Sequence, residues 1–181
     1  MMERFDGGMR AVVITISDRC AAGTQVDLSG PTVVRLLVAA GLPAPTQATL
    51  PDERDEIANA LRLYAETAQL IVTTGGTGLA PRDVTPEATR MVCDRLVDGL
   101  SERMRSAGLL QTPLAALSRA VCGCVGATLI VNLPGSPAGA EHSLRAILPL
   151  LPHAILLLSD RATHGAAPAT SADTARGDGI R

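Results

Sequence analysis

Apolar residues in this chain occur in two patterns that alternate along its length. The stretches Arg10 to Ile16 and Leu70 to Thr74 are continuous and rich in β-branched residues, which is typical of strands covered on both faces of a parallel sheet. Two further strands are expected at residues 120–125 and 128–133, joined by a turn at Gly126-Ala127.

Between these strands, apolar residues recur every three or four positions and predict helices. Each expected helix begins at a residue suited to cap it: Ser29 for the first, Asp52 for the second, Thr85 for the third and Thr112 for the fourth. A last helix is expected at about 138–148. Because strands and helices alternate, the pattern predicts a three-layer α/β/α fold around a mostly parallel sheet.

The length of 181 residues suits a single domain, which we expect at 10–161, after an N-terminal extension at 1–9 and before a disordered tail at 162–181. A net charge of -2 with one Phe, one Tyr and no Trp argues against nucleic-acid binding. The apolar run at 146–158 contains Pro149 and Pro152 and is too short to cross a membrane, so it is expected in the core.

The first ten residues lack the basic start and apolar centre of a secretion signal, so we expect a cytoplasmic protein with reduced thiols. The four cysteines and three histidines do not show the spacing of a zinc site.

Polar and glycine residues follow three of the expected strands. Ser17 and Asp18 follow the first, the segment from Gly75 to Asp83 follows the second, and Asn132 to Ser136 follow a later one. In parallel sheets ligands bind at the carboxyl ends of the strands, so these segments are expected to form one site.

The turn Gly75-Gly76-Thr77-Gly78 is suited to binding an anion, because glycine accepts positive φ and lets backbone N–H groups approach phosphate oxygens. Arg82 can add a two-pronged charge, and Asp83 can hold a metal ion. The turn matches neither the Walker A nor the dinucleotide pattern, and the chain has no lysine, which excludes lysine chemistry. A simple flexible connection is the alternative interpretation.

These segments resemble those of the Mog-type molybdopterin adenylyltransferases of the molybdenum cofactor biosynthesis family. The resemblance runs from Val12 to Leu158 and rests on motifs in the same order: Ile16-Ser17-Asp18-Arg19, Ser29-Gly30-Pro31, Leu50-Pro51-Asp52-Glu53, Thr73 to Gly78 with Arg82 to Ala88, Leu117-Ser118-Arg119, and Asn132 to Pro137.

The resemblance implies that ATP and molybdopterin react to give adenylyl-molybdopterin and pyrophosphate, with Mg²⁺ as cofactor. It also implies a homotrimer and contact with a molybdate-insertion enzyme. Nucleotidyl transfer suits these residues, because it depends mainly on in-line positioning and on neutralising phosphate charge.

By the same resemblance, Asp52 and Asp83 are the catalytic, Mg²⁺-binding carboxylates. ATP and its phosphates would contact Ser17, Asp18, Gly75, Gly76, Thr77 and Gly78, and molybdopterin would contact Ser118, Arg119, Asn132, Pro134, Gly135 and Ser136. Structural alternatives remain: Asp52 as a helix cap, Asp83 as a cap or a partner of Arg82, and Arg119 in an exposed ion pair.

Many relatives carry a lysine where this chain has Ala138, so a phosphate contact there is absent or comes from another arginine. The rival functions are a non-catalytic molybdopterin-binding scaffold and, ranked lower, a molybdate-inserting enzyme, which would need further domains.

Overall fold

The computed structural model describes residues 5–164, and these form three layers around a six-stranded sheet with the order β2-β1-β3-β6-β5-β4. The strands are β1 (Ala11–Ile16), β2 (Thr46–Leu50), β3 (Leu70–Thr74), β4 (Arg95–Leu96), β5 (Cys122–Val125) and β6 (Thr128–Leu133). β1, β2, β3 and β6 pair with one another in parallel. β5 pairs antiparallel with β6, and β4 pairs antiparallel with β5. The mostly parallel sheet expected from the sequence is therefore confirmed.

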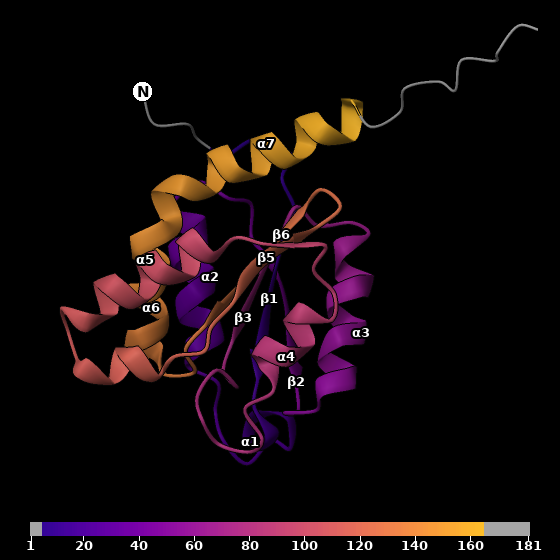
Figure 1. Cartoon of the computed structure of the whole chain (residues 1–181). Helices are drawn as coiled ribbons and strands as arrows, with labels where there is room; N and C mark the ends of the chain where they lie inside the picture. Colours follow the sequence, from indigo (N-terminus) through magenta and orange to yellow (C-terminus); the bar gives the residue numbers. More distant parts are fainter. Residues whose placement is uncertain (1–4, 165–181) are drawn as a thin grey trace, which may run out of the picture.

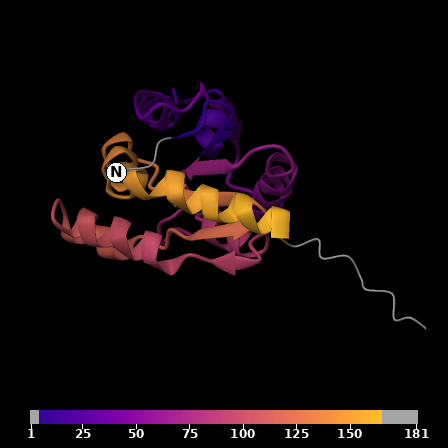
Figure 2. The same cartoon turned by 90° about the horizontal axis from the view of Figure 1, so that it is seen from above.

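The helices cover both faces of the sheet (Figures 1 and 2). They are α1 (Asp18–Ala21), α2 (Ser29–Ala39), α3 (Arg54–Ala65), α4 (Thr85–Arg90), α5 (Asp98–Leu109), α6 (Pro137–Ile147) and α7 (Leu151–His164), with 3₁₀ helices η1 (Pro113–Leu117) and η2 (Leu148–Leu150). α2, α5, α6 and α7 contribute to one core cluster, and α3 and α4 contribute to the other.

Alternation along the buried strands supplies both clusters. In β6, Leu129, Val131 and Leu133 face the cluster beneath α2, α5 and α6, whereas Ile130 faces the cluster beneath α3 and α4. Because neither face of the central sheet contacts water, its strands are apolar at consecutive positions rather than at every second one.

Several elements were missing from the sequence prediction. β2 (TQATL) is an edge strand with largely exposed side chains, and it lacks the apolar run that marks β1 and β3. α1 has one turn and no buried residue, and α5 buries only Leu100, Ser101 and Met104. The segment expected to be a helix from Thr112 is the 3₁₀ helix η1, although Thr112 does cap it by accepting a hydrogen bond from Leu114 N.

The helix caps expected at Ser29 and Thr85 were wrong. Another side chain caps the helix in the first case, and the hydroxyl group bonds outside the helix in the second. α2 begins at Ser29, and the Asp27 carboxylate accepts the N–H groups of Ser29 and Gly30. Thr85 is the first residue of α4 and donates its hydroxyl to Gly75 O. Met91 is 49% exposed because α4 ends at Arg90, although its spacing from Ala88 predicts an inward side chain.

The apolar C-terminal run contributes one side to the core. By length and composition alone, Pro137–Ser159 is one helical run in the described part of the chain that is apolar enough to cross a membrane. However, η2 interrupts it, and Ile147, Leu151 and Ile155 are fully buried, whereas Leu150, Leu156 and Leu157 are exposed. One side of the run therefore packs in the core, and the expectation for residues 146–158 is confirmed only for that side. α7 extends to His164, beyond the domain end expected at 161, and the rest of the expected tail, 165–181, lies outside the described residues, as do residues 1–4. Within the expected extension, Phe5 and Met9 pack against the core.

Candidate functional site

The carboxyl ends of β1, β3 and β6 meet at one edge of the sheet, beside α1 (Figure 1). Two cavities open at this edge. The larger, of about 900 Å³, extends along α5, η1 and α6, and the smaller, of about 690 Å³, lies between α1, the start of α2 and the segment after β3. Gly76, Asp83, Gly135 and Ser136 line both cavities, which therefore adjoin.

The structure brings nearly all of the expected site residues to these two cavities. The smaller cavity contains Ser17, Asp18, Asp52 and Gly75, the larger contains Thr77, Gly78, Ser118 and Pro134, and the four shared residues complete the set. Arg119 and Asn132 are the two expected site residues that line neither cavity.

The glycine turn has the geometry expected of an anion-binding loop. Gly75 and Gly76 have φ values of +105° and +62°. A Cβ atom at Gly75 would lie 2.1 Å from Ile16 O, and one at Gly76 would lie 2.3 Å from Thr85 Oγ1. Only glycine fits at these two positions, because the backbone is left-handed and its surroundings are closed.

Hydrogen bonds anchor every carbonyl of the turn. The Thr85 hydroxyl and amide donate to Gly75 O (2.9 Å) and Gly76 O (3.1 Å), and Arg119 donates its amide to Thr77 O (2.9 Å) and its Nε to Gly78 O (2.6 Å).

The amide groups of the same turn are arranged differently. Gly75 N donates to Leu133 O, but the amides of Gly76, Thr77 and Gly78 have no hydrogen-bond partner within residues 5–164. Three successive donors without a partner beside the cavities are suited to binding an anion.

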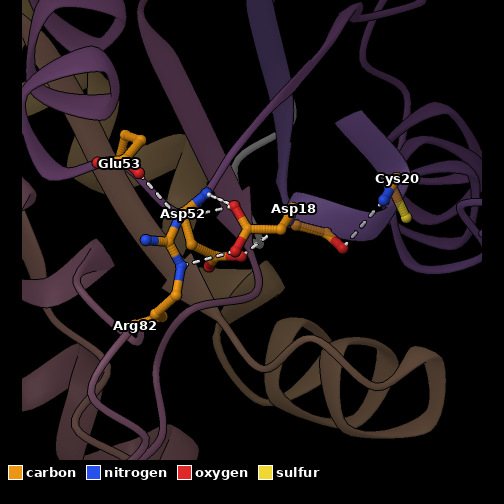
Figure 3. A network of polar contacts seen from close by, with 6 residues as sticks. Asp18, Cys20, Asp52, Glu53 and Arg82 are labelled. Atoms are coloured by element: carbon orange, nitrogen blue, oxygen red, sulfur yellow. Dashed lines mark hydrogen bonds and ion pairs between the residues drawn. The ribbon is translucent and has the colours of Figure 1, made fainter. Parts of the chain in front are cut away.

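Asp18 and Asp52 hold the ends of β1 and β2 together (Figure 3). Asp52 Oδ2 accepts a hydrogen bond from Asp18 N (2.9 Å), and Asp18 Oδ1 accepts one from Asp52 N (3.0 Å). The alternative of Asp52 as the cap of α3 is therefore wrong: Glu53 is the N-cap residue and makes no side-chain capping bond. A carboxylate that is locally placed to cap a helix instead bonds across 34 residues.

Burial raises the pKa of Asp52, and the nearby charges of Asp18 and Asp83 raise it further against the lowering effect of the Asp18 amide. Hydrogen bonds from Arg82 lower the pKa of Asp18. Two neighbouring carboxylates thus have opposite shifts, because one faces a guanidinium and the other is desolvated among acids.

Asp83 lines both cavities and is not the partner of Arg82. Its Oδ2 accepts a hydrogen bond from Ala80 N (2.8 Å), which closes the turn at 80–83. A Cβ atom at Gly78 would lie 2.8 Å from the same oxygen, so the Asp83 carboxylate lies directly beside the glycine turn.

Arg82 instead contacts two other acids, which the sequence did not reveal. Its Nε and Nη2 donate to the two carboxylate oxygens of Asp18 (2.7 and 2.9 Å), and Nη2 also donates to Glu53 Oε1 (2.9 Å) (Figure 3). Asp18 and Arg82 lie 64 residues apart in the chain, so no local pattern could have paired them.

Arg119 holds the segment after β3 and lines neither of the two cavities. Besides Gly78 O, it donates Nη2 to Asp83 O and forms an ion pair with Glu87 through Nη1. The ion-pair interpretation of Arg119 is thus correct, and the same side chain also fixes the backbone on both sides of residues 79–82. A direct ligand contact by Arg119 stays a prediction.

Asn132 is fully buried on the other face of the sheet from the larger cavity. Its amide nitrogen donates to Thr73 Oγ1 (3.0 Å) and Thr89 Oγ1 (2.9 Å), and its Oδ1 accepts a hydrogen bond from Val121 N (3.3 Å). The side chain lies on the same face of β6 as Ile130, towards α4, whereas the larger cavity lies under α5 and α6. The structure therefore does not support direct ligand contact by Asn132.

Within residues 5–164, no group of three or more His, Cys, Asp and Glu side chains is arranged to hold a metal ion. Asp52 and Asp83 each have one carboxylate oxygen without a hydrogen-bond partner in this part of the chain. Such a pair suits Mg²⁺, which proteins commonly hold through one or two carboxylates together with waters and substrate phosphates.

The position of the missing lysine, Ala138, lines the larger cavity near the start of α6. Two arginines line the same cavity: Arg145 pairs with Glu141, and Arg105 donates Nη1 to Ala120 O (3.2 Å). Ser136 caps α6 by accepting a hydrogen bond from Gly139 N (3.2 Å), so this helix begins at the boundary of the two cavities.

Comparisons with known proteins show the family of this chain. A family described as "Probable molybdopterin binding domain" matches residues 12–153. The molybdopterin adenylyltransferase of Helicobacter pylori strain J99 is 40% identical over 151 residues, which cover 81% of this chain and 85% of that protein. The molybdenum cofactor synthesis protein cinnamon of Drosophila melanogaster is 45% identical over 153 residues, which cover 82% of this chain and 25% of that protein.

Solved structures show the same fold. The molybdopterin biosynthesis enzyme MoaB from Thermus thermophilus has 48% identity and a TM-score of 0.78, covering 84% of this chain and 97% of that one. The molybdopterin biosynthesis Mog protein from Mycobacterium ulcerans has 38% identity and a TM-score of 0.79, covering 83% and 99%.

Proposed function

The chain belongs to the family of molybdopterin-binding domains, and we propose that its two adjoining cavities bring ATP and molybdopterin together for adenylyl transfer. The chain is a molybdopterin adenylyltransferase of molybdenum cofactor biosynthesis, as its 40% identity to the Helicobacter pylori enzyme supports. The reaction joins AMP from ATP to the terminal phosphate of molybdopterin and releases pyrophosphate.

The observation that carries the proposal is the shared boundary of the two cavities. The smaller cavity, with Ser17, Asp18 and the glycine turn, binds ATP, and the larger cavity binds molybdopterin. An oxygen of the molybdopterin phosphate attacks the α-phosphorus of ATP, and the bond from that phosphorus to the pyrophosphate oxygen breaks. Both reacting phosphates then lie at Gly76 and Asp83, where the cavities meet.

The glycine turn stabilises charge in this step. The amides of Gly76, Thr77 and Gly78 are free to donate to phosphate oxygens, and the anchored carbonyls keep them in place without reorganisation. Asp52 and Asp83 would hold Mg²⁺ through their unpartnered oxygens, and the ion would neutralise phosphate charge when bound.

The phosphate contact absent at Ala138 is assigned to Arg105. Arg145 lies on the same helix as Ala138, but Glu141 holds its guanidinium, whereas Arg105 uses only Nη1 in a backbone contact.

We propose a homotrimer and contact with a molybdate-insertion enzyme, in a cytoplasmic location. Exposed leucines at the end of α5 and in η1 support an assembly, since Leu110 and Leu114 are 85% and 68% exposed, and Leu109 and Leu117 are exposed as well. Sedimentation at micromolar concentration tests the assembly, and a monomer would contradict it.

Release of pyrophosphate from ATP, on addition of molybdopterin and Mg²⁺, tests the function. The enzyme releases pyrophosphate only when all three are present. A scaffold of the same fold would bind molybdopterin and release none, and that result would overturn the proposal.

A further inference from the structure

The smaller cavity has too little free positive charge for the ligand assigned to it. Four carboxylates line it, from Asp18, Asp27, Asp52 and Asp83, against two guanidinium groups, from Arg19 and Arg82. ATP is a strongly anionic ligand, and the Arg19 guanidinium alone would face four carboxylates as well as the phosphates, so the guanidinium of Arg82 is needed too.

The Arg82 guanidinium already has acidic partners within the chain. It makes a two-pronged contact with Asp18 and a third hydrogen bond to Glu53, and so fastens the segment Leu79–Asp83 to the ends of β1 and β2 (Figure 3). The Glu53 carboxylate takes part in this contact instead of capping α3, although Glu53 occupies the N-cap position.

This contact is of a kind that a phosphate can displace. The side chains of Arg82, Asp18 and Glu53 are 55%, 42% and 53% exposed, and ion pairs between such exposed groups contribute little to stability. The planar fork that fits a carboxylate also fits a phosphate, which offers more oxygens and more negative charge.

We propose that Arg82 is a phosphate-binding latch: in the free enzyme it is held by Asp18 and Glu53, and on binding of a nucleoside triphosphate it transfers to the phosphates. The inference rests on the proposed function, because it takes ATP as the ligand of the smaller cavity. The transfer concerns the Arg82 side chain alone, because Arg119 holds the backbone on both sides of residues 79–82 through Gly78 O and Asp83 O.

Two variants of one ion pair distinguish a latch from a structural salt bridge. Glu53→Gln weakens the closed state and leaves Arg82 available, so ATP should bind about twofold to fivefold more tightly, the range an exposed ion pair supports. Arg82→Gln removes the phosphate contact, so ATP should bind at least about tenfold more weakly.

The neighbouring pair Arg54 and Asp55 supplies matched controls. These side chains contact each other (3.1 Å) and line neither cavity. Arg54→Gln and Asp55→Asn remove the same charges a residue or two from Glu53, so they measure the long-range effect of charge on ATP binding, which is subtracted from the effects of the two latch variants.

The measurement is calorimetric titration of the full chain with ATP and Mg²⁺, without molybdopterin, on variants whose melting temperatures confirm folding. Opposite signs for Glu53→Gln and Arg82→Gln, beyond the controls, support the latch. The same sign for both, or unchanged affinity in Arg82→Gln, overturns it. If the unmodified chain does not bind ATP at all, the proposed function fails instead, so the two failures are distinct.

Discussion

Gly76→Val is the sharpest test of whether the glycine turn binds phosphate or only links β3 to α4. Gly76 has φ of +62°, where a β-branched residue is strained by about 1–3 kcal/mol. The new Cβ would also lie 2.3 Å from Thr85 Oγ1 and 3.1 Å from Asp52 Oδ1. Thr85 must then rotate and release Gly75 O, a buried hydrogen bond whose loss costs about 1–3 kcal/mol.

Together these effects predict a loss of about 2–6 kcal/mol in the free energy of unfolding. For a domain of this size, at about 2–4 °C per kcal/mol, that corresponds to a decrease of roughly 4–24 °C in melting temperature. Total stability is typically about 5–15 kcal/mol, so the protein stays folded at low temperature over most of this range.

Gly126→Val is the matched control. Gly126 also has positive φ, +53°, but a Cβ atom there meets nothing within 4 Å, and the turn between β5 and β6 lines neither cavity. This variant therefore carries the backbone strain alone, with a predicted cost of about 1–3 kcal/mol.

The assay compares ATP affinity by calorimetry with melting temperature by circular dichroism for both variants. Because the side chain at position 76 displaces phosphate from the adjacent amides, affinity should fall about tenfold or more in Gly76→Val and stay unchanged in Gly126→Val. If a folded Gly76→Val protein binds ATP normally, the turn is an ordinary connection and the reasoning is refuted.

Three further predictions concern the charged groups. Asp52→Asn and Asp83→Asn should each lower turnover about 10²-fold while the fold persists, and near-normal pyrophosphate release in both would rule out the carboxylate roles. Because the folded pKa of Asp52 is raised, its ionisation costs stability as pH rises through that pKa, so Asp52→Asn should melt at the same or a higher temperature at pH 7. Asp18 has a lowered pKa and stabilises the fold above its unfolded pKa, so Asp18→Asn should melt lower at pH 7. A lower melting temperature for Asp52→Asn, or an unchanged one for Asp18→Asn, would contradict these signs. Arg119→Gln should lower both turnover and the free energy of unfolding, the latter by about 1–3 kcal/mol, because two backbone carbonyls lose their donor. The control Glu87→Gln removes only an exposed ion pair worth about 0–1 kcal/mol. Equal effects of the two changes on melting temperature would contradict this role of Arg119.

The parts of the fold that the sequence predicted are those in which burial is strong and local. β1 and β3 are buried on both faces, and their continuous β-branched runs identify them. β2 could not be found this way, because an exposed edge strand is held by its pairing with β1 rather than by its own apolar residues.

The sequence also predicted the backbone conformation that the site requires. Paired glycines after a buried strand predicted positive φ, and the structure has it at Gly75 and Gly76. The hydrogen-bond partners of the charged side chains could not be predicted. Asp52 and Arg82 bond to Asp18 across 34 and 64 residues, while their sequence neighbours suggested a helix cap for Asp52 and a pair with Asp83 for Arg82. Capping propensity is a local preference, and tertiary hydrogen bonds between loops override it.

Asn132 shows a limit of predicting side-chain direction from the alternation of faces along a strand. Asn132 follows Val131 and so lies on the same face of β6 as Ile130, which can be derived from the sequence alone. However, both faces of β6 are buried, so alternation does not reveal which face adjoins the cavity. That depends on the positions of α5 and α6, which the apolar pattern of β6 does not encode. Because Asn132 joins β3 and α4 through Thr73 and Thr89, its amide acts on the site by holding the strand that leads into the glycine turn.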